Sequence, residues 1–208
     1  MPALIESAIA HLLQPYLSGS GAYPDTDLDP SLLSQFSTYL DLLLKWNART
    51  NLTAIRDPEE IVRRHFGESL FASRHLSLAT TTLLDLGSGA GFPGIPIALL
   101  HPEVAVTLAE SQNKKATFLR ESIRTLGLPV EVWSARAETM PESRHFHTVT
   151  LRAVDNMPAA IAAAAPRATH ELLLLSSTPP TPPPNFTLQP PIPIPNTQSG
   201  NLFRAIRN

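Results

Sequence analysis

Residues 83–94 read Leu-Leu-Asp-Leu-Gly-Ser-Gly-Ala-Gly-Phe-Pro-Gly, an apolar run that passes directly into four closely spaced glycines. The apolar run predicts a buried β-strand, and the glycines let the main chain turn sharply and approach a ligand without obstruction by Cβ atoms. A helix that begins after such a turn directs unpaired N–H groups toward a negatively charged ligand. The segment therefore predicts a strand, a ligand-binding turn (the glycine turn, residues 87–94) and a helix.

The chain that follows this segment alternates between predicted strands and helices. Short apolar runs indicate strands, and apolar residues at helical spacing indicate helices. The predicted strands are 104–109, 130–133, 148–151 and 172–175, and the predicted helices are 114–127 and 156–165. Strands that alternate with helices form a parallel sheet with both faces covered. We therefore expect an α/β fold with a Rossmann-like parallel sheet and helices on both faces.

The N-terminal third is predicted to be mostly helical. Asp-Pro pairs at 29–30 and 57–58 are helix start signals, because Asp caps a helix N-terminus and Pro fits its first turn. Apolar residues within 32–44 recur at helical spacing and form one broad face. We expect another helix over residues 2–14 and one that ends near residue 64. These helices form an N-terminal extension to the sheet.

The last part of the chain is rich in proline. Nine prolines fall within residues 179–195, and proline can neither donate to a sheet ladder nor fit a helix interior. We expect this stretch to be extended and partly mobile, with residues 201–206 returning as an edge strand. The chain then divides into a helical extension (1–66), a ligand-binding core (67–178) and a Pro-rich C-terminal segment (179–208).

Composition excludes several classes of protein. The chain has 208 residues, a net charge of −2 and no cysteine, which excludes a disulfide framework, a thiolate metal site and a cysteine nucleophile. No apolar run is long enough to span a bilayer, and no Lys or Arg precedes the first apolar residues, so we expect a cytoplasmic protein without a signal peptide or membrane partner. Residues 1–41 contain five acidic residues and no Lys or Arg, which leaves a charge of +3 on the remainder and permits an anionic partner.

Two acidic residues flank the glycine turn. Asp85 precedes Gly87 by two residues, and Glu110 follows it by 23, at the end of the next predicted strand. A carboxylate at Glu110 can accept hydrogen bonds from ribose hydroxyls. A second negative charge at Asp85 would repel a pyrophosphate but suits a ligand with an ammonium and a sulfonium group, which indicates S-adenosylmethionine. Dinucleotide binding and a plain strand-to-helix connection are the alternatives, although Phe92 stands where a dinucleotide turn needs Gly or Ala.

Further motifs follow in order along residues 42–175. They are Leu44-Lys-Trp-Asn47, Asn51-Leu-Thr-Ala54, Arg56-Asp-Pro-Glu59, Arg64-His65, Glu110-Ser111, Arg136-Ala-Glu138 and Leu151-Arg-Ala-Val154. With the glycine turn, they resemble the RsmG (GidB) family, bacterial enzymes that methylate N7 of a guanine in 16S ribosomal RNA. The resemblance implies a class I methyltransferase fold, S-adenosylmethionine as the methyl donor, and 16S rRNA or the small ribosomal subunit as partner. We also expect the protein to be a monomer. Methylation of another RNA or a small molecule, and a non-catalytic paralogue that binds S-adenosylmethionine or RNA, are the alternatives.

The predicted cofactor-binding residues lie at the ends of the predicted strands. From the residues themselves, we assign Glu110 to the ribose, Asp85 to the methionyl end directly or through water, and the main chain at Gly89 to the turn. The resemblance adds Gly87 and Phe92 in the cofactor pocket, Ala137 and Glu138 at the adenine edge, and Arg152 between cofactor and substrate. Guanine N7 has a free lone pair and loses no proton, so we expect positioning rather than a catalytic base, with Arg152 as the one candidate catalytic residue.

Basic residues on the predicted helices and loops form the candidate RNA surface. They are Arg63, Arg64, Lys114, Lys115 and Arg136. The alternatives are solvated surface charges and, for Arg136, a pair with Glu138. We expect no metal site, since His145 and His147 alternate beside a strand without a carboxylate cluster.

The chain departs from the family pattern at several places, one of which is Arg167-Ala-Thr-His170, where the family has a Gly-Gly turn before the fifth strand. Glu68 follows His65 where the family has His-x-x-Asp, and we expect a buried hydrogen-bonded pair there. Ser176 and Ser177 stand where the family has Lys-Gly after the fifth strand, and the Pro-rich segment follows. The change from Lys-Gly to Ser176-Ser177 removes a cation that the family places near the RNA or the target base.

Overall fold

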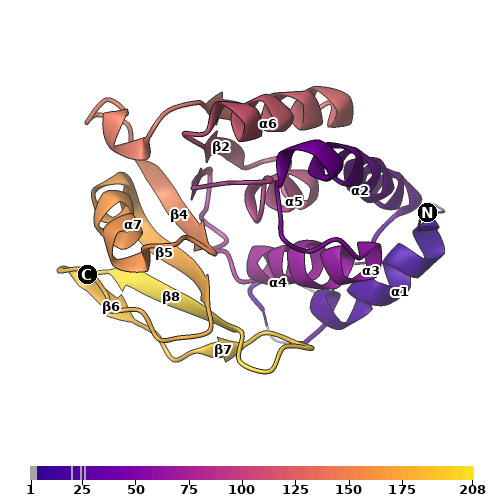
Figure 1. Ribbon diagram of the computed structural model, residues 1–208. Helices are drawn as coiled ribbons and strands as arrows, with labels where there is room; N and C mark the ends of the chain where they lie inside the picture. The colour runs from indigo at the N-terminus through magenta and orange to yellow at the C-terminus, as the bar shows by residue number, and fades with distance from the viewer. Residues whose placement is uncertain (1–3, 20, 24, 26) are drawn as a thin grey trace.

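Figure 1 shows the computed structural model, which describes residues 4–19, 21–23, 25 and 27–208. Its centre is one sheet in the order β3-β2-β1-β4-β5-β8-β6, and β7 also pairs with β8. The strands are β1 (Thr82–Leu86), β2 (Ala105–Ala109), β3 (Glu131–Trp133), β4 (Phe146–Arg152), β5 (Ala168–Ser176), β6 (Phe186–Leu188), β7 (Ile192–Pro193) and β8 (Asn201–Arg207). The first five strands are parallel, which confirms the predicted α/β sheet.

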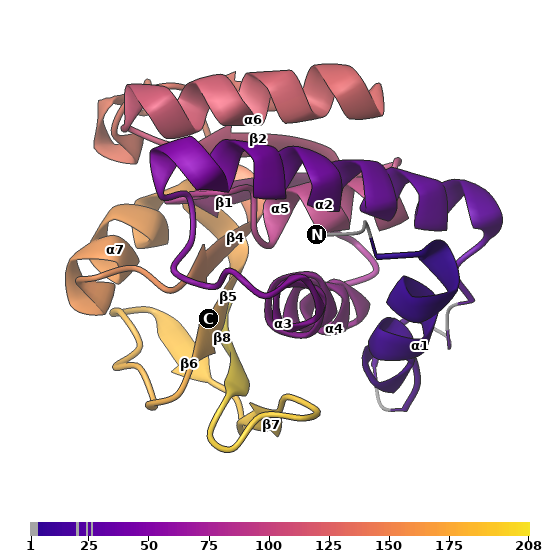
Figure 2. The ribbon, with the colours of Figure 1, turned by 45° about the vertical axis from the view of Figure 1, so that its right-hand side comes forward.

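The sheet separates two hydrophobic cores because successive strand residues point to opposite faces. Leu83 of β1 lies in one core and Leu84 in the other, and Leu172 and Leu173 of β5 divide in the same way. One core is covered by α7 (Met157–Ala164), which packs Ile161 against the sheet. The other helices cover the opposite face (Figures 1 and 2), and they are α1 (Glu6–Leu17), α2 (Pro30–Thr50), α3 (Pro58–Ile61), α4 (Glu68–Arg74), α5 (Gly94–Leu100) and α6 (Asn113–Leu126).

Both predicted Asp-Pro helix starts are confirmed. The Asp29 carboxylate accepts a hydrogen bond from the Leu32 N–H at 2.8 Å, and the Asp57 carboxylate accepts one from the Glu60 N–H at 2.8 Å. The predicted start of the first helix at residue 2 lies outside the described residues, and within them α1 begins at Glu6. In Figure 2, α2 runs alongside α6, and the two helices are in contact.

The helix that starts at Asp57 is longer than predicted. Instead of ending near Arg64, it continues as a π-helix, η1 (Val62–Gly67), and then as α4 to Arg74. Tertiary packing drives this extension, because α4 is buried along its whole length and Gly67 packs closely against the ring of Tyr16. A Cβ at Gly67 would come within 2.5 Å of that ring. The boundary drawn at residues 66/67 therefore falls inside one continuous helical run.

The Pro-rich segment contributes more to the sheet than its composition predicts. It contains β6 and β7, and β8 lies between β5 and these short strands rather than at the edge of the sheet, so the expected edge position of β8 is wrong. The pairing is stabilised by burial of Phe186 and Phe203 and by the ion pair of Arg204 with the fully buried Glu171 at 2.8 Å. No helix among the described residues is long and apolar enough to cross a lipid bilayer.

Candidate functional site

The glycine turn connects β1 to α5 through a main chain that only glycine adopts easily. Gly87, Gly89 and Gly91 have φ values of 74°, 59° and 92°. The N–H groups of Gly87 and Ser88 donate to the carbonyl of Ala109 at 2.9 and 3.0 Å, which ties the turn to the end of β2. The turn is thus bonded to both of two neighbouring parallel strands.

Asp85 holds the glycine turn through hydrogen bonds to two of its residues. Its side chain is buried, and Oδ2 accepts hydrogen bonds from the Ser88 hydroxyl at 2.6 Å and the Gly94 N–H at 3.1 Å. Oδ1 accepts a hydrogen bond from the Thr150 hydroxyl at 2.8 Å. Burial raises the pKa of Asp85, and these hydrogen bonds oppose that rise. The carboxylate therefore organises the turn and is not among the residues that line the adjacent cavity.

Glu110 lies at the end of β2 and faces the turn. Its Oε2 accepts a hydrogen bond from the Gly89 N–H at 3.0 Å, and its Oε1 accepts one from the Gln112 N–H at 2.7 Å. The side chain is buried but lines a cavity of about 220 Å³, the smaller cavity. Each carboxylate oxygen can accept a further hydrogen bond, so Glu110 can still bind a ligand hydroxyl.

The smaller cavity collects four of the predicted cofactor residues. It lies between the carboxyl ends of β1 to β3 and the first part of α7, and its lining includes Gly87, Glu110, Ala137, Glu138, Arg136 and the α7 residues Ala159, Ala160 and Ala163. The α7 alanines were not predicted, although a run of small residues on one helix is a signal of close approach. Asp85, Gly89 and Phe92 support the turn but do not line this cavity, and Arg152 lies in a neighbouring one.

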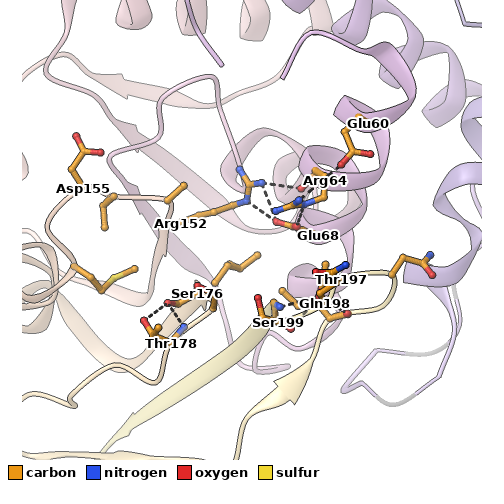
Figure 3. A pocket seen from close by; sticks show the side chains of 18 of the residues that line it. Glu60, Arg64, Glu68, Arg152, Asp155, Ser176, Thr178, Thr197, Gln198 and Ser199 are labelled. Carbon is orange, nitrogen blue, oxygen red and sulfur yellow. Dashed lines mark hydrogen bonds and ion pairs between the residues drawn. The ribbon is translucent and has the colours of Figure 1, made fainter. Parts of the chain in front are cut away.

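Arg152 ends β4 and holds together a group of polar side chains (Figure 3). Its Nη2 donates to Glu68 Oε2 at 3.0 Å, to His65 Nδ1 at 2.9 Å and to the Arg64 carbonyl at 2.8 Å. The other Glu68 oxygen accepts a hydrogen bond from Arg64 Nε at 2.8 Å. The Arg152 and Glu68 side chains are only 11% and 9% exposed, so the pair is shielded from solvent. His65 and Glu68 thus meet through Arg152 rather than by bonding each other.

His65 is held neutral within this group. Its pKa is lowered to about 3, first by burial and then by the positive charges of Arg152 and Arg64. Because Nδ1 accepts from Arg152, Nε2 carries the proton and donates to the Thr53 hydroxyl at 2.7 Å. The imidazole ring stacks on Phe92 with centroids 4.9 Å apart. His65 therefore joins the polar group to the glycine turn.

The N-terminal helix α2 contacts the glycine turn directly, and the sequence did not predict this contact. The Tyr39 hydroxyl of α2 donates a hydrogen bond to the Ala90 carbonyl. The Tyr39 ring lies 5.3 Å from Phe92 and 5.2 Å from Phe66, in a buried aromatic cluster. Burial raises the pKa of Tyr39 well above its ordinary value, so the hydroxyl remains a donor at neutral pH. The extension is therefore part of the support of the turn.

A larger cavity of about 770 Å³ opens beside the smaller one. It is lined by the Arg152 group, by the segment after β4, by residues 176–178 after β5, and by the loop between β7 and β8 (the C-terminal loop, residues 194–200). The linings of the two cavities come together where Gly87 of the smaller one lies beside Val154 of the larger one, since a Cβ added at Gly87 would lie 3.1 Å from Val154 Cγ1. A third, mainly apolar cavity of about 600 Å³ lies between α7 and the Pro-rich segment.

The predicted RNA contacts border the carboxyl edge of the parallel strands, on different elements. They are Arg63 and Arg64 on η1, Lys114 and Lys115 in the first turn of α6, and Arg136 just before the 3₁₀ turn η2 (Ala137–Thr139). Arg63 forms an ion pair with Glu59 at 2.8 Å. No ion pair joins Arg136 to Glu138, both of which the structure describes. The described residues contain no group of three or more His, Asp or Glu side chains placed to bind a metal.

Comparison with known proteins gives a consistent family. The family model described as rRNA small subunit methyltransferase G matches residues 32–176. A protein named Ribosomal RNA small subunit methyltransferase G from Xylella fastidiosa is 47% identical over 132 residues, which cover 63% of this chain and 61% of that protein. One of the same name from Stenotrophomonas maltophilia is 42% identical over 154 residues, with 74% and 69% covered. The chain thus spans about three fifths of the length of the Xylella relative.

Solved structures agree on the fold. An O-methyltransferase from Bacillus cereus in complex with SAH superposes with a TM-score of 0.58 at 16% identity, over 82% of this chain and 91% of that one. TrmN from Thermus thermophilus gives a TM-score of 0.56 at 17% identity, over 71% and 53%. At these identities the likeness shows the fold alone, and that fold is the one shared by class I methyltransferases.

Proposed function

Because the chain belongs to the rRNA small subunit methyltransferase G family, we propose that it transfers a methyl group from S-adenosylmethionine to N7 of a guanine in 16S ribosomal RNA. The observation that carries the proposal is the pairing of Glu110 with the glycine turn at the mouth of the smaller cavity. We place the enzyme in the cytoplasm as a monomer, with the small ribosomal subunit or its RNA as partner.

The residues of the smaller cavity fit a nucleoside with a cationic side chain. Glu110 keeps acceptor capacity for two ribose hydroxyls, and Gly87 leaves its wall free of a Cβ. Ala137 and Glu138 would meet the adenine edge. Asp85 would act on the methionyl end through the turn, because its own oxygens already accept hydrogen bonds from the chain.

The chain's part in the chemistry is positioning. Bound S-adenosylmethionine supplies an electrophilic methyl group on a sulfonium. Guanine N7 has a lone pair and loses no proton, so none of the chain's residues needs to act as a base. Gly87 of the smaller cavity lies beside Val154, which lines the larger cavity with Arg152, and this arrangement would align the two reactants. Arg152, held by Glu68 and His65, would orient the substrate side.

A methyl-transfer assay tests this function. Labelled S-adenosylmethionine is incubated with the full chain and with small subunits, large subunits or free 16S rRNA that lack the modification, and N7-methylguanine is mapped along the RNA. We expect one modified guanine in the small-subunit RNA. Label in the large subunit, at another atom or in no RNA would contradict the proposal.

A methyltransferase for a different RNA is the second candidate. The observation that favours it is that residues 177–208 lie outside the family match yet supply one wall of the larger cavity. Transfer to another RNA in the same assay would select this candidate.

A further inference from the structure

The larger cavity has two walls of different chemistry (Figure 3). Above in that view lies the charged group of Arg64, Glu68 and Arg152. Below it lie hydroxyl and amide side chains from two separate segments, and those labelled in the view are Ser176, Thr178, Thr197, Gln198 and Ser199. The same wall of the lining also includes Ser177 and Asn196. All but Ser176 of this neutral wall fall outside the family match at residues 32–176.

The C-terminal loop is built as a fixed part of this wall. The Ile194 N–H donates to the Gly200 carbonyl at 2.9 Å, and the Thr197 hydroxyl donates to the Ile194 carbonyl at 2.9 Å. Ile194 is buried in the core, which anchors the base of the loop. Gln198 and Ser199 are exposed toward the cavity, and their side chains make no hydrogen bond to the described residues. The loop therefore presents free amide and hydroxyl groups from a fixed backbone.

The charges around the cavity argue against a phosphate as its occupant. Two arginines, Arg64 and Arg152, face three acids, Glu60, Glu68 and Asp155, so the lining has an excess of one negative charge. Such a lining suits an uncharged group with many hydrogen-bond donors and acceptors, or a group that gains positive charge during the reaction. A guanine fits both descriptions, because methylation at N7 makes the base cationic.

We propose that the larger cavity receives the target guanine, extruded from the RNA, and that Gln198 and Ser199 of the C-terminal loop help to select it by hydrogen bonds to its edge. The inference rests on the proposed function and deepens it. Enzymes that modify a base inside folded nucleic acid bind it in an extruded form. A volume of about 770 Å³ accommodates a guanine base with its ribose, and Val154 of this lining lies beside Gly87 of the smaller cavity, where the methyl group would cross.

Filling the cavity gives the largest expected change. In Ser199→Trp, the indole occupies space beside the loop, whereas the control Ser143→Trp places the same side chain on an exposed loop that lines none of the three cavities. We expect Ser199→Trp to lower kcat/KM for small ribosomal subunits more than about tenfold. The Kd for S-adenosylmethionine, measured by calorimetry on the same preparation, should stay within about twofold in both variants, because neither substitution changes a residue of the smaller cavity.

A finer test removes one amide. Gln198→Ala should lower kcat/KM for small subunits about threefold to tenfold, the range for one lost neutral hydrogen bond. The matched control is Gln189→Ala, because Gln189 lies in the same Pro-rich segment but lines none of the three cavities. Wild-type methyl transfer combined with unimpaired Ser199→Trp and Gln198→Ala variants overturns this inference alone. Absence of transfer by the wild type overturns it together with the proposed function.

Discussion

The glycine turn and the C-terminal loop line adjoining cavities, yet different forces hold them. The turn is built from neighbours in sequence, with Asp85, Ser88 and Gly94 joined by short-range hydrogen bonds. The C-terminal loop depends on β8 pairing with β5 and on Ile194 reaching a core made by distant helices. The glycine turn therefore combines a motif that is visible in the sequence with contacts from β2 and α2, whereas the C-terminal loop takes its place only once β8 has paired with β5.

The substitution Glu110→Ala should have the largest effect of the variants, and that effect should fall on the binding of S-adenosylmethionine in the smaller cavity. It removes the ribose acceptor and leaves the N–H groups of Gly89 and Gln112 without their partner. Affinity for S-adenosylmethionine should fall about tenfold to a hundredfold, the effect of losing hydrogen bonds to a charged group. Calorimetry measures this, with Glu142→Ala, on an exposed loop, as the control. Equal affinities in the two variants would remove Glu110 from the donor side.

His65 contacts both Arg152 and Phe92 of the glycine turn, and the pH dependence of the free energy of unfolding tests whether it is buried there in its neutral form. Its folded pKa of about 3 lies below the unfolded value of 6.5, so the unfolded chain binds the proton first as pH falls. The stability present above pH 6.5 is lost on acidification, by about 2 kcal/mol between pH 7.5 and pH 5. Denaturant unfolding at several pH values should show a shallower pH dependence for His65→Gln than for the wild type. Parallel profiles would contradict the buried, neutral imidazole.

Tyr39→Phe asks whether the N-terminal extension supports the donor side. The variant loses the hydrogen bond to Ala90 but keeps the aromatic cluster, so unfolding should cost about 1 kcal/mol less. Affinity for S-adenosylmethionine should fall about threefold because the turn is less well held. Thr50→Ala removes a comparable hydroxyl-to-carbonyl bond, to Trp46, at the last residue of α2. If both variants bind the donor equally well, the extension does not act on the turn.

Arg63→Glu should have the smallest effect and bears on the RNA alone. The Arg63 side chain is 38% exposed and forms an ion pair with Glu59, so its contact with a phosphate would be weak. The slope of log affinity for RNA against log salt concentration should decrease by about one, with donor binding unchanged. An unchanged slope would mean that this face does not meet RNA.

Prediction from sequence worked where structure is local. The strand at residues 82–86, the turn after it and the Asp caps at Asp29 and Asp57 follow from neighbouring residues. It failed where packing decides, as in the helix that runs on to Arg74 because its whole surface is buried. Composition could not indicate that β8 would lie inside the sheet, because that position depends on pairing with β5 and β6.

The candidate site divides in the same way. Glu110, Gly87, Ala137 and Glu138 come together at one cavity because each follows a parallel strand or its connection. Asp85 and Phe92, which the sequence also assigns to the cofactor pocket, are buried and do not line this cavity, so their assignment stays a prediction. The residues of the C-terminal loop carried no motif, so only the fold could place them beside Arg152.

A crystal structure of the chain with S-adenosylhomocysteine tests the central claim most directly. The account predicts the nucleoside in the smaller cavity, with ribose hydroxyls about 2.6–3.2 Å from the Glu110 carboxylate. Density for the ligand in another place, or a bound dinucleotide in that cavity under competition, would contradict it.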